Sequence, residues 1–269
     1  MKMEGKRVLV TGSGTGVGKG VALEFAEEGA TVAVHYSSSA AGAEDTVKQI
    51  TDGGGKAKAF KADMNDLGAI KNLATDAIDY LGGLDILINN SGITLTLPFE
   101  EVTPEKYDEI YNVNIRAMFF LTQYCVPTME SQGRGVVLNI SSVHAYTGLA
   151  EHSVYAGTKG AIVSYTRALG HELNDKGIRV NCIAPGWVFI EKHEAALPPG
   201  FDMEAAKALM PSKFIATPRQ VGRLALFMAS EDADYMVGHT VLFDGGQVGI
   251  QPLAKEITKL FNDCLPSKK

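Results

Sequence analysis

Tyr155 and Lys159 stand four residues apart in a segment, beginning at Ser153, that has the pattern of a helix start. Residues at positions i and i+4 share one face of a helix, so the phenol and the ammonium would act on the same small volume. A free phenol titrates at about pH 10, too high for proton transfer near neutrality, whereas a nearby positive charge favours the phenolate. Tyr155 is therefore a candidate general acid and base.

Ser142 is the third chemically useful side chain in this part of the sequence. It closes the apolar, strand-like run 135–142, where its hydroxyl would be available to a substrate oxygen. The pattern Tyr-x-x-x-Lys alone arises often by chance, so its meaning depends on the elements that would hold these side chains together.

Short apolar runs rich in β-branched residues alternate with helical patterns along the chain. Expected strands cover 7–10, 31–35, 56–61, 84–88, 135–140, 178–183 and 240–243, and expected helices cover 17–28, 40–52, 67–81, 114–131, 153–176 and 217–230. Strands separated by such helices form βαβ units and a mostly parallel sheet, and continuously apolar strands are buried on both faces. The pattern predicts an α/β fold: a single-domain, Rossmann-type doubly wound parallel sheet of about seven strands with helices on both faces.

We expect this domain to span 1–249, because no linker, repeat or low-complexity tract divides it. The segment 187–217 is interrupted by prolines and is the least regular part, which favours a lid over a pocket. Residues 250–269 follow as a tail, with a short helix expected over 252–260.

A glycine-rich turn joins the first expected strand to the first expected helix. Its sequence, Thr11-Gly-Ser-Gly-Thr-Gly-Val-Gly18, places Gly12, Gly16 and Gly18 where the chain must turn. Glycines let a backbone approach a pyrophosphate closely, and a helix N-terminus offers free N–H groups and a positive dipole end. The spacing differs from the commoner Gly-x-Gly-x-x-Gly, and a merely flexible turn is the alternative. Its position between strand and helix favours dinucleotide binding.

Composition excludes several classes of partner. The net charge of −6 comes with scattered Lys and Arg residues, so nucleic acid is not expected as a partner. No stretch approaches the roughly 20 apolar residues of a membrane span. The six histidines show no metal-ligand spacing, and the three cysteines form no CxxC pair, so we expect no metal site. The apolar run behind the N-terminus is too short for an export signal, which favours a reduced, cytoplasmic location.

An ordered series of motifs resembles the short-chain dehydrogenase/reductase family over residues 5–247. After the glycine turn come Asp63, the stretch Asn89-Asn-Ser-Gly92, Asn114, then Ser142 with Tyr155 and Lys159, and Pro185-Gly186. Each motif alone is weak, but the full series in this order is very specific. Within the family, reductases of 3-oxoacyl thioesters are the most similar type, with sugar and polyol dehydrogenases near them.

The resemblance implies a hydride-transferring oxidoreductase that acts on a small carbonyl or secondary alcohol substrate. Tyr155 would exchange a proton with the substrate oxygen, Lys159 would assist it and bind the nicotinamide ribose, and Ser142 would orient the carbonyl. Asn114 would anchor a water that relays protons. The cofactor-binding residues that the resemblance implies are Gly12, Thr15, Gly16, Val17, Gly18, Tyr36, Ser37, Ser38, Asp63, Met64, Asn90, Ser91, Gly92, Tyr155, Lys159, Pro185, Gly186 and Val188.

Purely structural roles are the alternative for several of these residues. A serine at a strand end is usually a turn or cap residue, and Asn114 could be an N-cap. Asp63 could cap the helix that begins near Leu67, and Asn89-Asn90 could be a turn pair in left-handed geometry. The ordered series favours the functional roles.

The end of the second expected strand bears on cofactor choice. Sites for NAD commonly carry an acidic residue about 20 positions after the glycine turn, which accepts from the ribose 2′-OH. Here the chain reads Tyr36-Ser-Ser-Ser39, with no carboxylate to repel a 2′-phosphate and with hydroxyls to bind one. NADP(H) is therefore favoured over NAD(H), although the nearest basic residue, Lys19, is on the helix.

Substrate contacts are expected from His144, Tyr146 and Trp187, with Phe189 and His193 as further pocket candidates. A solvent-facing loop is the alternative for His144. Ile190 stands where the family commonly has a Thr that binds the nicotinamide carboxamide, and it cannot make that hydrogen bond. Alternatives for the whole chain are an NAD(H)-dependent sugar or polyol dehydrogenase, a catalytically silent NADP-binding regulator, and a sugar-nucleotide epimerase or dehydratase.

The resemblance also implies a homo-oligomer, either a tetramer or a dimer. The helices expected over 114–131 and 153–176 would pair across a twofold axis, and the last strand would form a second interface.

Overall fold

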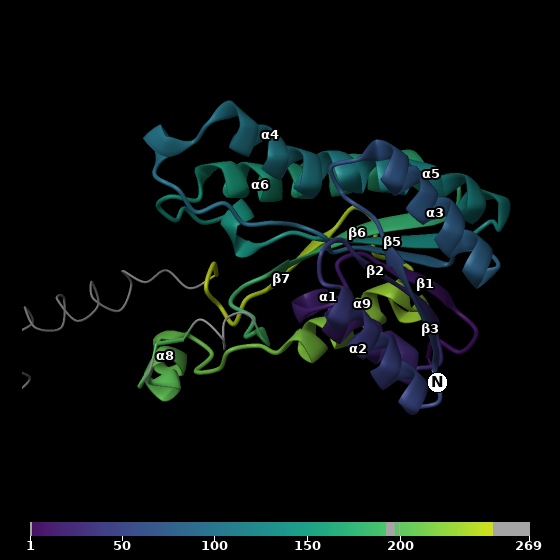
Figure 1. Ribbon diagram of the computed structural model, residues 1–269, viewed down its shortest axis with the longest axis horizontal. Coiled ribbons are helices and arrows are strands. Elements are labelled where there is room, and N and C mark those ends of the chain that lie inside the picture. The colour runs from purple at the N-terminus through teal and green to yellow at the C-terminus, as the bar shows by residue number, and fades with distance from the viewer. Residues whose placement is uncertain (1, 192–196, 199, 250–269) are drawn as a thin grey trace, which may run out of the picture.

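The computed structural model describes residues 2–191, 197–198 and 200–249 (Figure 1). The predicted tail over 250–269, its helix over 252–260, and His193 lie outside the described residues. Among the described residues, no helix is long and apolar enough to cross a bilayer.

Seven parallel strands form one sheet in the order β3-β2-β1-β4-β5-β6-β7. Their bounds are Arg7–Val10 for β1, Thr31–Tyr36 for β2, Lys56–Lys61 for β3, Ile86–Asn89 for β4, Gly135–Ile140 for β5, Ile178–Pro185 for β6 and Thr240–Phe243 for β7. The strand order runs one way from β1 to β3 and the other way from β4 to β7, so the sheet is doubly wound, as predicted. The strand expected over 84–88 begins two residues later, at Ile86, and ends one residue later, at Asn89. The N–H of Leu84 donates to the Gln132 side chain at 3.1 Å rather than to a neighbouring strand.

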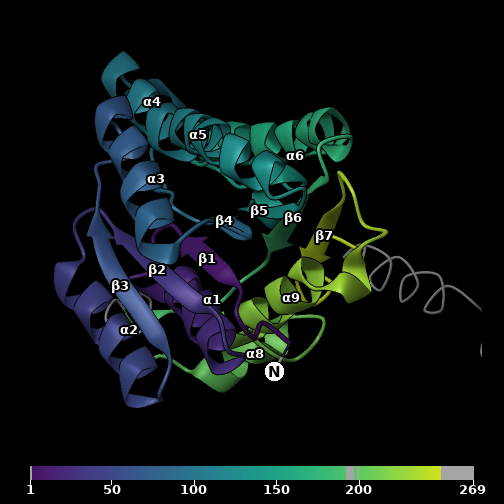
Figure 2. The ribbon, with the colours of Figure 1, turned by 90° about the vertical axis from the view of Figure 1, so that its right-hand side faces the viewer.

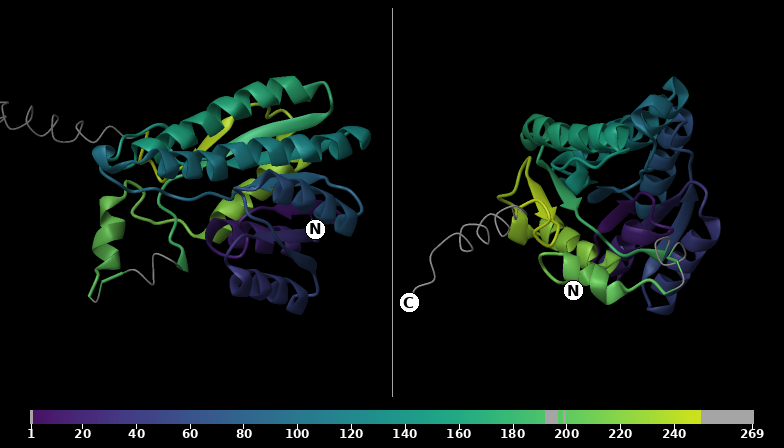
Figure 3. Two further views of the ribbon diagram at one scale, coloured as in Figure 1. Left: turned by 45° about the horizontal axis from the view of Figure 1, so that its top comes forward. Right: turned by 90° about the vertical axis from the view of Figure 1, so that its left-hand side faces the viewer.

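Helices cover both faces of this sheet (Figures 1 and 2). One layer contains α1 (Gly16–Glu27), α2 (Ala40–Asp52) and α9 (Pro218–Ala229). The other contains α3 (Leu67–Leu81), α4 (Pro104–Tyr111), α5 (Ala117–Ser131) and α6 (Ser153–Asn174). Figure 3 shows the two layers on opposite sides of the sheet from two further directions.

The structure adds elements that the periodicity did not predict. These are α4, the first two residues and the π-helical character of η2 (Asn112–Arg116), α8 (Met203–Leu209) and the short 3₁₀ turns η1 (Phe99–Glu101), η3 (Val143–Ala145) and η4 (Glu231–Ala233). Of the eight residues in α4, only Ile110 is buried, so its sequence carries no apolar stripe from which a helix could be predicted. The predicted lid over 187–217 contains α8 and one parallel bridge, between Val188 and Ala216.

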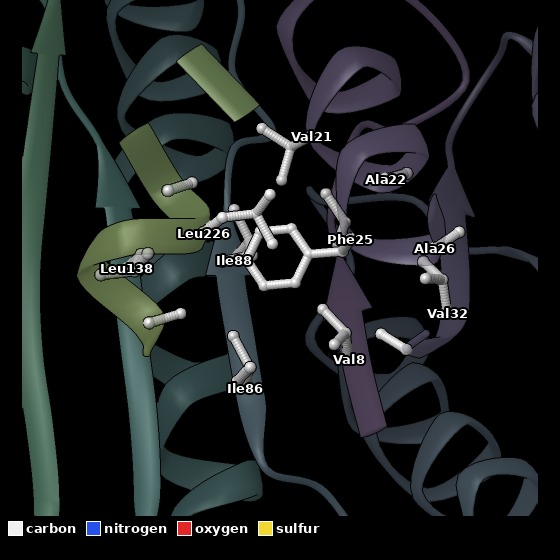
Figure 4. Close-up of a cluster of buried hydrophobic side chains, with 14 of the residues drawn as sticks. Val8, Val21, Ala22, Phe25, Ala26, Val32, Ile86, Ile88, Leu138 and Leu226 are labelled. Carbon is white, nitrogen blue, oxygen red and sulfur yellow. The ribbon is translucent and has the colours of Figure 1, made fainter. Parts of the chain in front are cut away.

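The core lies on both faces of the central strands. Figure 4 shows Phe25 of α1 against Val8 and Ile88 of the sheet, with Leu226 of α9 beside it. Burying a side chain such as Phe25 stabilises the fold by roughly 1.5–3 kcal/mol. A second cluster, around Leu87, fills the space under α3 and α5. Because the strands are buried on both sides, loops can reach the sheet only at its edges and ends.

Helices α1 and α9 pack closely through glycine. A Cβ on Gly20 would lie 2.4 Å from the carbonyl carbon of Pro218, and a Cβ on Gly222 would lie 2.9 Å from the carbonyl oxygen of Gly20. Only hydrogen fits at both positions. This contact holds α1 under the sheet with its N-terminus at the carboxyl ends of the strands.

Candidate active site

A cleft of about 1020 Å³ runs along the carboxyl ends of the strands and reaches the start of α6. In open parallel sheets, ligands bind at this edge, where the strand order reverses. Most of the predicted site residues line it: Gly12, Thr15, Gly16, Val17, Ser37, Ser38, Asp63, Met64, Asn90, Ser91, Gly92, Ser142, His144, Tyr155, Lys159, Pro185, Gly186, Trp187 and Val188. Four other predicted residues, Gly18, Tyr36, Asn114 and Tyr146, lie outside its lining.

The glycine turn has the backbone geometry that its sequence indicates. Gly12 (φ +63°) and Gly16 (φ +56°) are in the left-handed region, which favours glycine. A Cβ on Gly18 would lie 2.3 Å from the carbonyl oxygen of Gly12, so Gly18 lets α1 approach the turn. The shape of the turn therefore requires glycine at all three positions.

The turn already holds a carboxylate. The backbone N–H of Gly16 donates to Oε2 of Glu191, 3.0 Å away, although the two residues are far apart in the chain. Lys19 Nζ lies 3.9 Å from the other oxygen of the same carboxylate and 2.8 Å from Asp45. An N–H at a helix start that binds one anionic oxygen fits a phosphate oxygen equally well.

His35 supports the turn from the end of β2, a role that the sequence analysis missed. Gly12 N donates to Nδ1 of His35 at 3.0 Å, and Nε2 lies 3.2 Å from the Ala62 carbonyl oxygen, to which it donates. Burial lowers the pKa of His35 to about 4, so the ring is neutral at neutral pH. The signal in the sequence was a histidine inside an otherwise apolar strand.

The loop after β4 is tied to the same turn. Thr11 Oγ1 accepts from the backbone N–H groups of Asn90 and Ser91, each at 2.9 Å. The Asn90 amide donates in turn to the carbonyl oxygens of Thr11 and Gly12 at 2.9 and 3.2 Å. Among the described non-glycine residues only Glu151 and Lys213 have positive φ, so the left-handed turn pair proposed for Asn89-Asn90 is wrong.

Asp63 is exposed at the end of β3 and lines the cleft. Its Oδ1 accepts from the backbone N–H of Asn65 at 2.9 Å. The N-cap of α3 is Asp66, which accepts from Gly68 N at 2.7 Å, so the capping alternative for Asp63 is wrong.

Tyr155 and Lys159 share one face at the start of α6, as their spacing predicts. The Lys159 ammonium lies 5.5 Å from the centroid of the Tyr155 ring. Lys159 is buried and donates from Nζ to the Ile140 carbonyl oxygen at 3.0 Å, which fixes its head at the end of β5. Ser141 Oγ donates to the Lys159 carbonyl oxygen at 2.8 Å and so ties α6 to the same strand.

Ser142 begins the short turn η3. Its Oγ accepts from the backbone N–H of His144 at 3.3 Å, which is a capping contact, and its side chain also lines the cleft beside Tyr155. The hydroxyl proton stays available to a ligand, because this contact uses only a lone pair of the oxygen.

Asn114 lies inside a continuous helical run from α4 through η2 to α5, so the N-cap alternative is wrong. Its amide donates to the Ile93 carbonyl at 2.9 Å and to Thr158 Oγ1 at 3.1 Å, while Ile93 N donates to Asn114 Oδ1 at 2.8 Å. A Cβ on Gly92 would lie 3.2 Å from that same Oδ1. The residue therefore joins the loop after β4 to α6, and π segments of this kind are frequent at functional sites.

The predicted substrate contacts separate into two groups. His144 and Trp187 line the cleft, whereas Tyr146 is exposed outside it, so the structure gives no support to a substrate contact by Tyr146. Phe189 and Trp187 both pack against a buried cluster of Ala206, Met210 and Ile215. Ile190 packs against the position of Gly16, where a Cβ would lie 3.5 Å from its Cγ2, so it covers the turn through apolar contact.

Two further observations concern side chains that could bind a metal ion or form a disulfide. Among residues 2–191, 197–198 and 200–249, no group of three or more His, Cys, Asp or Glu side chains could hold a metal ion. Cys125 and Cys182 are free and buried, and burial raises the pKa of these thiols to about 12 and about 11.

Comparison with known proteins identifies the class. The family model described as enoyl-(acyl carrier protein) reductase matches residues 12–247. The chain belongs to the short-chain dehydrogenase/reductase family, and as such it is an NAD(P)-dependent oxidoreductase that acts on CH–OH or C=O groups.

Individual relatives cover nearly the whole chain. The hydroxynaphthalene reductase-like protein Arp2 of Metarhizium robertsii is 37% identical over 257 residues, which is 91% of this chain and 96% of the relative. A 7α-hydroxysteroid dehydrogenase, solved with NADH and 7-oxo glycochenodeoxycholic acid, has a TM-score of 0.86 at 33% identity, covering 92% of this chain and 96% of that one. A short-chain dehydrogenase from Burkholderia cenocepacia, solved with NADP, has a TM-score of 0.83 at 30% identity, covering 91% and 98%.

Proposed function

We propose that the protein transfers a hydride between NADP(H) and a small carbonyl or secondary alcohol substrate, with Tyr155 as general acid and base. The observation that carries this proposal is that Ser142, Tyr155 and Lys159 line the same cleft as the glycine turn, with the Lys159 ammonium 5.5 Å from the centroid of the Tyr155 ring. Ser142 and Lys159 are buried, and Lys159 is hydrogen-bonded to both Ile140 and Ser141, so the end of β5 and the start of α6 are held together before any ligand arrives.

Each of these residues has its own role in the proposed reaction. Ser142 and Tyr155 hold the substrate oxygen, and Tyr155 gives it a proton during reduction and takes one back during oxidation. Lys159 lies beside the phenol ring, where its positive charge favours the phenolate. Asn114, bound to both Ile93 and Thr158, would anchor a water that returns protons toward Lys159. When bound, the nicotinamide supplies or accepts the hydride.

The residues along the cleft fit a dinucleotide. The turn at Gly16 would hold the pyrophosphate, as its N–H already binds a carboxylate oxygen. Asp63, with Oδ1 engaged by Asn65, would contact the adenine, and the backbone of 90–92 would lie beside the adenine ribose. Lys159 would bind the nicotinamide ribose. Pro185, Gly186 and Val188 would flank the nicotinamide.

NADP(H) is the cofactor that the charges favour. Ser37, Ser38 and Ser39 line the cleft after β2, and Ser39 Oγ would lie 2.6 Å from a Cβ on Gly14, so the serines stand against the turn. None of the residues 36–39 is acidic, so nothing at this point repels a 2′-phosphate. Lys19 is a nearby cation, held at the turn by its ion pairs. One solved relative contains NADH and another contains NADP, so the choice between NADP(H) and NAD(H) needs a direct test.

The substrate is a free small molecule in this proposal, and the protein works as a cytoplasmic homo-oligomer without nucleic acid or membrane. One relative is named a hydroxynaphthalene reductase-like protein, so two-ring aromatic ketones join the candidates.

The deciding experiment follows loss of reduced nicotinamide absorbance with NADPH or NADH. The substrates are 1-tetralone, a 3-oxoacyl thioester, a diketone, a ketose and an aromatic aldehyde.

We expect NADPH to be consumed faster than NADH, and Tyr155→Phe to lose at least about a hundredfold in kcat, because general acid catalysis contributes on this scale. NADPH binding should change by no more than about threefold, because Lys159 and the glycine turn are retained. Tight cofactor binding with no turnover in either protein would favour the silent regulator instead. Equal or faster use of NADH with a ketose would favour the sugar or polyol dehydrogenase.

A further inference from the structure

Two stacked imidazoles stand at the substrate end of the cleft, and the mechanism above uses neither. The rings of His144 in η3 and His152 just before α6 have centroids 5.2 Å apart and planes 12° apart. The His144 ring also meets Tyr155 edge-on, with centroids 5.6 Å apart. All three rings line the cleft, so they form one wall next to the phenol that would exchange the proton.

His152 is a fixed support for this wall. Its Nδ1 lies 2.8 Å from the Ala150 carbonyl oxygen, which can only accept, so Nδ1 carries the proton. Its Nε2 lies 3.2 Å from Thr96 Oγ1 and therefore accepts from that hydroxyl. Both ring nitrogens of His152 bind groups other than His144, so His152 contacts His144 only through the face of its ring.

The surroundings of His144 determine where its proton lies. Nδ1 is buried and has no hydrogen-bond partner among the described residues. A proton there would be a buried N–H without an acceptor, which folded proteins rarely tolerate. The neutral ring therefore carries its proton on Nε2. Charging the ring would also place a proton on Nδ1, and burial together with the facing His152 lowers the pKa of His144 accordingly.

Nε2 of His144 is thus an N–H donor of a residue that lines the cleft, and in the described part of the chain it has no hydrogen-bond partner. A neutral donor selects an oxygen acceptor without demanding a charge. We propose that His144 is a specificity-determining residue that donates a hydrogen bond from Nε2 to a second oxygen of the substrate, so that the preferred substrates are ketones carrying a hydroxyl or a second carbonyl group. This inference rests on the proposed function. The first oxygen of the substrate is the carbonyl oxygen that Ser142 and Tyr155 would bind, and the second is the one that His144 would bind.

The test compares ketones with and without the second oxygen in three variants. The ketones are 1-tetralone and its monohydroxylated forms, and the variants are His144→Gln, His144→Asn and His144→Leu. A glutamine amide places an N–H near the position of Nε2, whereas an asparagine amide reaches only the position of Nδ1. His144→Asn is therefore the matched control for His144→Gln.

We expect His144→Asn and His144→Leu to raise KM about tenfold for at least one hydroxylated ketone, the effect of one hydrogen bond, with kcat within about twofold. Neither variant should change KM for 1-tetralone. His144→Gln should restore KM for the hydroxylated ketone to within about threefold of wild type. Equal effects on the parent and all hydroxylated ketones, or no effect on any, would overturn the assignment.

A binding measurement separates this inference from the proposed function. Calorimetric titration of the NADPH-loaded protein compares 2-naphthol with naphthalenediols, which need no turnover. If no ketone is reduced but His144→Leu loses affinity for a diol and keeps it for 2-naphthol, the proposed reaction fails while the oxygen-binding role of His144 stands. Equal affinities of wild type and His144→Leu for every diol would remove that role, whatever the activity.

Discussion

His35 is a single residue on which the geometry of the glycine turn depends. Its neutral ring accepts from Gly12 and donates to the Ala62 carbonyl, so one side chain joins β1, β2 and the end of β3. Charging it would put a proton on Nδ1, against the N–H of Gly12, in a site that is 1% exposed. The turn is therefore held by a group whose protonation would break it.

A pH dependence of stability follows from this residue. Because the pKa of His35 is about 4 in the fold and 6.5 ordinarily, the unfolded chain takes up the proton first as pH falls. We expect the free energy of unfolding to drop by on the order of 3 kcal/mol between about pH 6.5 and pH 4, with no further loss from His35 below that. Urea unfolding across this range measures it.

His35→Asn is the comparison, because an asparagine oxygen can still accept from Gly12 but does not titrate. Its unfolding free energy should fall much less over the same pH range. His144, whose pKa is also lowered, contributes equally to both proteins. An identical slope in wild type and His35→Asn would contradict the prediction.

At the scale of elements, the segment after β6 reaches back over the glycine turn. Ile190 packs on Gly16, and Glu191 accepts from its N–H. A pyrophosphate bound at this turn would need the same N–H and carries the same sign of charge. We expect Glu191→Gln to bind NADPH about threefold to tenfold more tightly, a modest effect because the carboxylate is half exposed.

Fluorescence titration of NADPH measures this affinity. Glu109→Gln is the control, since Glu109 is another cleft carboxylate but lies on α4. Weaker NADPH binding by Glu191→Gln would mean that Glu191 supports the cofactor-bound state, contrary to this prediction.

The contact of α1 with α9 is a second prediction at this scale. Gly20→Ala would drive a Cβ into the Pro218 backbone, and we expect it to destabilise the fold by about 1–3 kcal/mol. Gly160→Ala, inside α6 with open space around it, should instead stabilise the fold by up to about 1 kcal/mol. Chemical unfolding of both variants tests the pair, and a Gly20→Ala protein as stable as wild type would show that the helices can separate at little cost.

At the scale of the whole molecule, the two largest buried clusters both pack against the same sheet. Assembly is the prediction that belongs here. Phe120 of α5 is half-buried, and its ring partners among the described residues are Phe119 and Tyr124. If α5 and α6 pair across a twofold axis, sedimentation should give two or four times the chain mass of 28.7 kDa.

Phe120→Glu should then lower the sedimenting mass, because a charge would be buried at the interface. Gln49→Glu, on exposed α2, should leave the mass unchanged. A wild-type mass of 28.7 kDa at micromolar concentration would contradict the expected oligomer.

Local patterns determined much of this protein. The alternation of strands and helices, the glycine turn and the Tyr155–Lys159 pair depend on periodicity and spacing within short segments, so they could be predicted from sequence. The missed helices, α4 and α8, are mostly exposed and carry little apolar periodicity.

Only the tertiary structure decided the contacts between segments distant in sequence. It brought Glu191 to Gly16, joined Asn114 to Ile93 and Thr158, and placed His35 between the turn and β3. It also left Nδ1 of His144 buried without a partner. Such contacts depend on which elements pack together and at what angle, a property of the whole fold that no local pattern contains.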